Sequence, residues 1–242
     1  MSDSPSLWNA PGAAHGRTRW LWPVLLCLLA YGLALEARLA ELPKWQSAEF
    51  QAAGEYLAAT HDSYAWLAGA QGLGDYAAFP FARLTRTLEE ITGARPGNLA
   101  LWAPAFFAAL VAPATLLWGL LLGGRTAGLA AGLTGAILPG FFIRTRMGYW
   151  DTDVFTLLGP LVAALCLAAL PGQAPAWTGL AAGLLCRFLN LPHQANVSLG
   201  FLTLALAVSL LLCRTSGPAL ARGLRLYLVF GLAAFPGWQD GA

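Results

Sequence analysis

The densest polar segment between two apolar stretches runs from Arg144 to Asp153 and reads Arg-Thr-Arg-Met-Gly-Tyr-Trp-Asp-Thr-Asp. Asp151 and Asp153 form an Asp-x-Asp pair, whose hard carboxylate oxygens suit Mg²⁺ or Mn²⁺. The guanidinium of Arg144 can bind a phosphate through two parallel hydrogen bonds, and Arg146 lies beside it in sequence. A further carboxylate, Asp62, lies in the segment His-Asp-Ser-Tyr-Ala-Trp. Three acids, a divalent ion and an arginine would suit a reaction on a lipid-linked phosphate or pyrophosphate.

The same residues also have a purely structural explanation. Asp and Thr directly before an apolar helix are common N-cap residues, and the helix dipole favours their negative charge. Arg144 and Arg146 can serve as anchors at the membrane interface. Because an Asp-x-Asp pair alone does not decide between capping and metal binding, both interpretations stay open at this point.

The composition defines the class of protein that must position these residues. Hydrophobic residues make up 57% of the chain and charged residues 11%, and the mean hydropathy is +0.59. Soluble domains carry about a quarter charged residues. A water-facing surface cannot be built from so few charges, so we predict an integral membrane protein whose surface contacts membrane lipids. The net charge of +2 gives no reason to expect nucleic acid as a partner.

Apolar segments of spanning or near-spanning length predict about seven transmembrane helices. These segments are residues 20–35, 99–122, 126–143, 154–170, 177–191, 199–213 and 224–235. We therefore predict an all-α fold, a polytopic membrane helix bundle. Residues 1–19 would form a cytoplasmic tail, and residues 20–242 one transmembrane domain.

The basic residues predict the orientation of this bundle, because they concentrate in cytoplasmic loops. With seven spans, one side carries Arg17, Arg19, Arg125, Arg214, Arg222 and Arg225. The opposite side, external or periplasmic in a multi-pass inner-membrane protein, then carries the long loop 36–98 with Asp62 and the short loop 144–153. Two surface helices are expected in the long loop, over residues 45–59 and 81–92.

The two acidic segments together resemble the acidic motifs of the oligosaccharyltransferase catalytic subunit family, which includes bacterial and archaeal single-subunit enzymes. The resemblance runs from the first predicted span through the fourth and covers Asp62-Ser63-Tyr64-Ala65-Trp66 and the segment from Arg144 to Asp153. It implies a GT-C type glycosyltransferase, which moves an oligosaccharide from a polyprenyl or dolichyl (pyro)phosphate carrier to Asn in an Asn-x-Ser/Thr acceptor polypeptide.

The resemblance also implies roles for individual residues. Asp62 and Asp151 would coordinate Mg²⁺ or Mn²⁺, and Asp153 would help to hold the metal site and engage the acceptor amide. Arg144 would orient the acids or bind the carrier phosphate, with Arg146 as a second phosphate ligand. The lipid-linked oligosaccharide and the acceptor polypeptide would be the two substrates.

Family members carry more spans, a later loop with a catalytic Glu, and a soluble C-terminal domain with a Trp-Trp-Asp-Tyr-Gly motif. These features are absent from the 242 residues. We therefore expect the N-terminal part of a longer protein, or a short homologue that needs a second chain. The alternative is a non-catalytic scaffold that binds the lipid carrier. A transporter is disfavoured, because the predicted spans are nearly free of charge.

Overall fold

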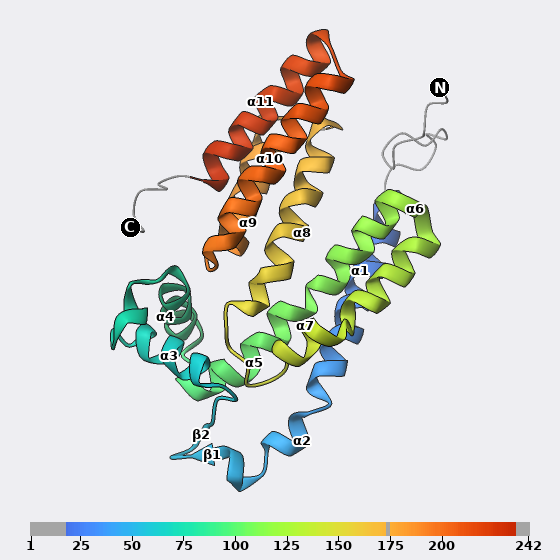
Figure 1. The fold of residues 1–242 in the computed structure, drawn as a ribbon. Coiled ribbons are helices and arrows are strands. Elements are labelled where there is room, and N and C mark those ends of the chain that lie inside the picture. The colour runs from blue at the N-terminus through green and yellow to red at the C-terminus, as the bar shows by residue number, and fades with distance from the viewer. Residues whose placement is uncertain (1–17, 173–174, 236–242) are drawn as a thin grey trace. The chain divides into compact units, whose positions relative to one another are not determined.

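The computed structural model describes residues 18–172 and 175–235, and most of these residues are helical, as predicted (Figure 1). The chain falls into two compact units, divided in sequence between Val154 and Phe155. The elements are α1 (Thr18–Leu39), α2 (Leu42–Trp45), β1 (Gln51–Ala52), β2 (Glu55–Tyr56), α3 (His61–Ala70), α4 (Pro80–Thr92), α5 (Pro96–Ala109), α6 (Val111–Ala136), α7 (Pro139–Arg144), α8 (Asp153–Ala169), α9 (Ala176–Asn190), α10 (Gln194–Arg214) and α11 (Gly217–Ala234).

Within the described ranges, three helical stretches are long and apolar enough to cross a membrane: Leu21–Trp45, Pro96–Gly135 and Ala195–Arg214. They agree with a helical membrane protein, but the expected count of about seven spans is not met. The reason is physical: α9 has 15 residues, fewer than the ~20 that a span needs. In α11, with 18 residues, Arg222 and Arg225 lower the hydropathy.

In the first unit, α6 is a helical hairpin rather than one straight helix, and Figure 1 shows it doubling back on itself. The turn lies at Gly124, whose φ of 73° is in the left-handed region that favours glycine. The two arms touch through small residues: a Cβ added at Gly119 would lie 2.4 Å from the Ala127 carbonyl oxygen. Arg125 therefore lies at the turn, between the second and third apolar segments.

The helix α1 packs along the first arm of α6, where Ala30 and Ala34 lie in one core with Ala112 and Leu116. Its C-terminal turn carries Arg38, which is fully buried. The Arg38 guanidinium donates to the Ala34 carbonyl at 3.1 Å and to Thr145 Oγ1 at 3.5 Å. It thereby joins the end of α1 to the polar segment that follows α7.

The long segment between α1 and α5 contains one of the two predicted surface helices. The prediction over residues 81–92 is confirmed by α4, which ends at Gly93 in a left-handed conformation with a φ of 65°. The prediction over residues 45–59 is wrong, because β1 and β2 form a short antiparallel hairpin there. Ala53 and Gly54, with φ of 51° and 79°, make its turn, and no helix can continue through two positive φ angles.

In the second unit, α9 packs closely against α11. A Cβ added at Gly183 would lie 2.6 Å from both the Ala233 Cβ and the Phe230 carbonyl oxygen, so only glycine fits there. Two buried amides hold α8 within this unit. Asn190 donates to the Gly159 carbonyl at 3.3 Å, and Asn196 donates to the Phe155 carbonyl at 2.7 Å. The two bonds tie the N-terminal half of α8, which contains Pro160, to α9 and α10.

Candidate functional site

The segment that follows α7 is fixed to the rest of the first unit by Gly148 and Trp150. The Gly148 N–H donates to the Leu101 carbonyl at 3.2 Å, and the Gly148 carbonyl accepts from the Ala59 N–H at 2.9 Å. Trp150 is fully buried, and its indole N–H donates to Thr85 Oγ1 at 3.0 Å. These bonds connect the segment to α5, to α4 and to the residues directly before α3.

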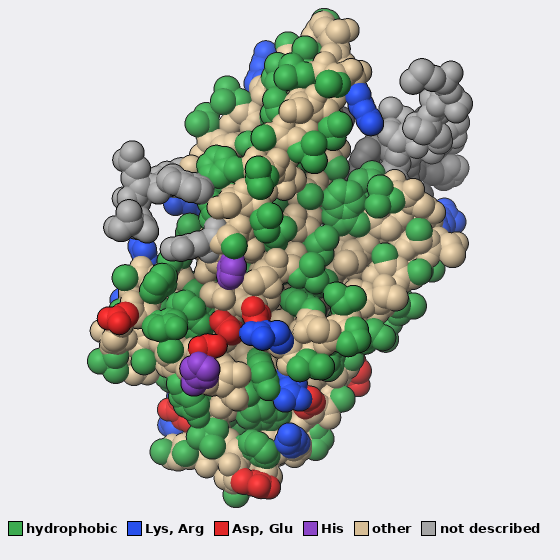
Figure 2. All heavy atoms as spheres, in the orientation of Figure 1, with side chains coloured by type: hydrophobic (Ala, Val, Ile, Leu, Met, Phe, Trp, Pro, Cys, Tyr) green, Lys and Arg blue, Asp and Glu red, His purple; other side chains and the backbone are tan. Residues whose placement is uncertain are grey.

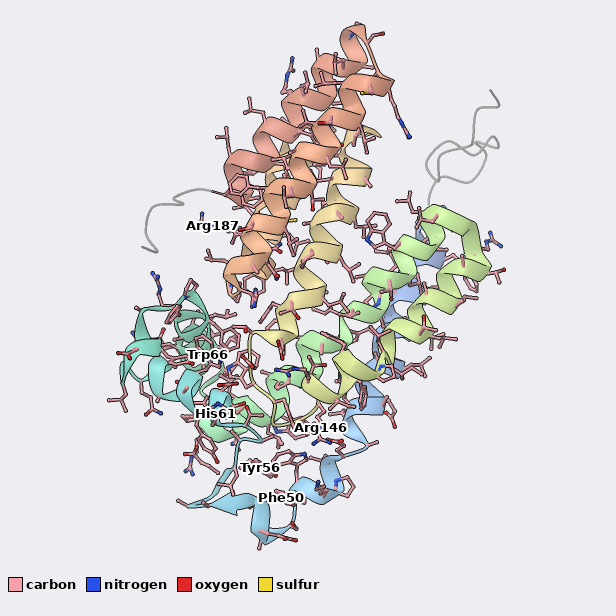
Figure 3. The ribbon with its side chains drawn as sticks, in the orientation of Figure 1. Phe50, Tyr56, His61, Trp66, Arg146 and Arg187 are labelled. Atoms are coloured by element: carbon pink, nitrogen blue, oxygen red, sulfur yellow. The ribbon has the colours of Figure 1, made fainter. Side chains whose placement is uncertain are left out.

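Asp62 lies in the first turn of α3, where the helix dipole favours a carboxylate. The N-cap of α3 is Thr60, whose side chain accepts from the Ser63 N–H at 3.2 Å. The Asp62 carboxylate is 40% exposed, and His61 Nε2 lies 3.0 Å from its Oδ1. Figure 3 shows His61 and Trp66 on this helix. Because Thr60 already caps the helix, capping alone does not explain Asp62.

Trp66 links α3 directly to the second acidic segment. Its indole N–H donates to Asp151 Oδ1 at 3.0 Å. The same oxygen accepts the Thr152 N–H at 2.6 Å and the Thr152 hydroxyl at 3.2 Å, so Oδ1 carries three hydrogen bonds. Asp62 and Trp66 are four residues apart and therefore lie on one face of α3. The two acidic segments, 85 residues apart at Trp66 and Asp151, thus meet in the folded chain.

Arg144 forms the electrostatic centre of the cluster. Its Nε donates to Oδ2 of Asp153, and Asp153 is the first residue of α8. That hydrogen bond, together with the Asp153 charge, raises the pKa of Arg144, and the charges of Asp151 and Asp62 raise it further. The side chain remains 67% exposed. One exposed guanidinium therefore lies within electrostatic reach of all three carboxylates predicted from the sequence.

Charged side chains gather over the part of the first unit that contains α2, α3, α4 and α7, whereas α6 shows mostly hydrophobic and uncharged atoms (Figure 2). This distribution is what a membrane protein requires when its chemistry takes place in water at one end of the apolar helices.

Arg146, which is labelled in Figure 3, contacts Tyr149 and Glu41. Its Nη2 donates to the Tyr149 hydroxyl at 2.9 Å, its Nη1 lies 3.6 Å from Glu41 Oε1, and the guanidinium covers the Tyr149 ring. The hydrogen bond to Tyr149 is the main cause of its raised pKa. These contacts engage both Nη atoms of Arg146, which a phosphate would also need. The role of Arg146 as a phosphate ligand stays a prediction.

The acidic cluster suits a divalent ion by donor type, since carboxylate oxygens are the ligands that Mg²⁺ and Mn²⁺ prefer. Among the residues of ranges 18–172 and 175–235, no group of three or more His, Cys, Asp or Glu side chains lies close enough to hold an ion. Asp153 instead accepts a hydrogen bond from Arg144, and Asp151 accepts one from Trp66. Metal binding by Asp62, Asp151 and Asp153 therefore stays a prediction.

Three residues that organise the cluster were not singled out by sequence reasoning: Trp66, Gly148 and Arg38. A signal for Trp66 existed, because its spacing of four from Asp62 places both on one helix face once α3 is recognised. Arg38 had a weaker signal, as a charge at the end of an apolar run. For Gly148 no local pattern could have shown the requirement, which comes from the distant Trp45 ring.

The fold and the cluster define a helical membrane protein with a charged site at one end of the first unit. Comparison with protein families gives the family: the model described as "Oligosaccharyl transferase STT3, N-terminal" matches residues 84–228, more than half of the 242 residues. The chain belongs to this family, and the resemblance drawn from its motifs is confirmed. The match includes Arg144, Asp151 and Asp153 but begins after Asp62. No curated protein matches the chain.

Proposed function

We propose that this chain is a GT-C type membrane glycosyltransferase of the oligosaccharyltransferase kind. It transfers an oligosaccharide from a polyprenyl or dolichyl (pyro)phosphate carrier to the side-chain nitrogen of Asn in Asn-x-Ser/Thr acceptors. The observation that carries the proposal is the meeting of the two acidic segments. Trp66 of α3 donates a hydrogen bond to Asp151, and the charges of Asp62, Asp151 and Asp153 all raise the pKa of Arg144. Family membership supplies the reaction class.

The proposed reaction breaks the bond between the anomeric carbon and a carrier phosphate oxygen, and it forms a bond from that carbon to the acceptor nitrogen. The amide proton passes to a carboxylate of the cluster, and the carrier leaves as its phosphate or pyrophosphate. An amide nitrogen is a weak nucleophile, and carboxylates that accept its N–H groups reduce its conjugation with the carbonyl. Asp62 is suited to this contact, because its side chain is partly exposed.

Arg144 is suited to the phosphate side of the reaction. Its Nε is held by Asp153, which fixes the plane of the guanidinium, and its exposed Nη donors are then available to phosphate oxygens. The same ion pair gives the Asp153 carboxylate a positioning role.

The implied ion would be held by Asp62 and Asp151, with Asp153 near by. When bound, Mg²⁺ or Mn²⁺ supplies positive charge that stabilises the departing phosphate. The site is proposed to face the external or periplasmic side of the inner membrane, because the basic turn at Arg125 and the basic residues around α11 favour the cytoplasmic side.

A transfer assay tests the proposal on membranes that contain the chain as its native gene encodes it. A lipid-linked oligosaccharide and a fluorescent Asn-x-Ser/Thr peptide are supplied with Mn²⁺, and glycosylated peptide is measured. Asp151→Ala is expected to lower the rate by about 10²- to 10³-fold, as for removal of other charge-stabilising groups. Asp75→Ala is the matched control, because Asp75 is exposed and lies in a separate 3-10 turn.

The outcomes separate the enzyme from the alternative. Equal transfer by the wild type and Asp151→Ala contradicts the proposed site. Binding of the lipid carrier without transfer by the wild-type protein supports a non-catalytic scaffold that binds the carrier.

A further inference from the structure

Trp66 occupies an unusual position for a buried tryptophan, because its only polar atom bonds to a carboxylate of the candidate site. The side chain is 9% exposed. The indole N–H donates to Asp151 Oδ1 at 3.0 Å, which is a normal length for such a bond. A hydrogen bond to an ionised acceptor is about twice as strong as one between neutral groups.

Other aromatic rings hold the indole in one orientation. Tyr76, Phe79 and Phe81 meet it edge to face, with ring centroids at 4.5, 6.0 and 5.0 Å. Phe81 also contacts the ring of Trp150 at 4.8 Å, and Trp150 is the residue directly before Asp151. The donor and the acceptor of the hydrogen bond are therefore both supported by one aromatic cluster, which fixes their separation.

We propose that Trp66 is a positioning residue that sets the orientation of the Asp151 carboxylate and its spacing from Asp62. The role rests on the proposed function, because it assumes that Asp151 and Asp62 act on one ion. With Oδ1 engaged by the indole and by Thr152, Oδ2 is the oxygen proposed to bind the ion. Since Asp62 lies one turn before Trp66 on α3, the same hydrogen bond ties the helix that carries Asp62 to Asp151.

A role in packing alone predicts different behaviour. Phenylalanine fills most of the space inside the aromatic cluster but has no N–H donor. If Trp66 only fills space, Trp66→Phe changes stability and leaves the site intact. If Trp66 positions Asp151, the same variant weakens metal binding. Residues that hydrogen-bond to metal ligands typically change affinity or activity about 10- to 100-fold when they are replaced.

Mn²⁺ binding to the full chain in detergent provides the readout, measured from the electron paramagnetic resonance signal of free Mn²⁺. The proteins compared are the wild type, Trp66→Phe, Asp151→Asn and the double variant. Tyr227→Phe is the matched control, because it also loses one buried hydrogen bond, of 2.9 Å, but one made to the Leu167 carbonyl within the second unit. Melting temperatures of all the variants are recorded alongside.

Trp66→Phe is expected to weaken Mn²⁺ binding by about 10- to 100-fold, with no further loss when it is combined with Asp151→Asn. Tyr227→Phe is expected to lower the melting temperature and leave Mn²⁺ affinity unchanged. Phe79→Leu, at the exposed wall of the aromatic cluster, loosens the indole but keeps its donor, and is expected to weaken binding by a smaller factor.

Wild-type Mn²⁺ affinity in Trp66→Phe, together with lost binding in Asp151→Asn, overturns the role of Trp66 and leaves the proposed function standing. Unchanged Mn²⁺ binding in Asp151→Asn, or no binding by the wild type, contradicts the proposed function and removes the role of Trp66 with it.

Discussion

Replacement of Gly148 by alanine is the sharpest structural perturbation of the candidate site. Gly148 has a φ of 81°, and an added Cβ would lie 2.4 Å from Cη2 and 2.6 Å from Cζ2 of Trp45. A left-handed conformation destabilises a residue with a Cβ by about 1–2 kcal/mol. Overpacking against a buried ring adds about 1–3 kcal/mol, so Gly148→Ala should lower the free energy of unfolding by about 2–5 kcal/mol.

Thermal unfolding of the purified full chain in detergent measures this effect. Gly140→Ala is the matched control, because Gly140 lies in α7 with open space at its Cβ position and no positive φ. In a Trp45→Leu background the penalty of Gly148→Ala should fall to about 1–2 kcal/mol, since only the backbone term remains. A wild-type melting temperature for Gly148→Ala would refute this reasoning. So would an equal loss of unfolding free energy on Gly148→Ala in the wild-type and Trp45→Leu backgrounds.

Three further variants probe the first unit. Glu89→Gln should raise the melting temperature at neutral pH, because burial raises the pKa of Glu89 in the folded protein above its ordinary value of 4.5. The contribution of Glu89 to stability is therefore greatest below pH 4.5 and is lost as the pH rises through the pKa of the folded state. A melting series across pH tests this, and an equal gain at acidic pH would contradict it. Trp150→Phe should lower the free energy of unfolding by about 1 kcal/mol through loss of the bond to Thr85, and an unchanged denaturation curve would count against that bond. Arg144→Lys should reduce oligosaccharide transfer by about tenfold or more with little change in melting temperature, because lysine keeps the charge but lacks the planar fork that faces Asp153. A normal transfer rate for this variant would remove the arginine from the site.

Much of the helical architecture could be predicted from hydropathy and local chemistry. The amphipathic spacing in residues 81–92 predicted α4, and the break between the apolar segments 99–122 and 126–143 agrees with the turn inside α6. The number of spans was harder to predict, because apolar runs shorter than ~20 residues form helices whether or not they cross a bilayer. The hairpin of β1 and β2 was missed because its signal lies in two positive φ angles, at Ala53 and Gly54.

The acidic residues of the candidate site were found from residue type and spacing, whereas their mutual arrangement was not. The sequence placed Asp62 and Asp151 on one side of the membrane but could not show what joins them. That link is the bond from Trp66, and it depends on α3, which was not predicted as a helix. The pairing of Arg144 with Asp153 likewise depends on the turn between α7 and α8, which only the folded backbone defines.

The central claim is that the two acidic segments act as one catalytic site, and a double-variant cycle on the transfer rate tests it most directly. Asp62→Asn, Asp151→Asn and the double variant are compared with the wild type in the peptide glycosylation assay with Mn²⁺. Residues that act as a unit are strongly non-additive, so the double variant should be no slower than the slower single variant. A normal rate for Asp62→Asn, or losses that simply multiply in the double variant, would contradict the account.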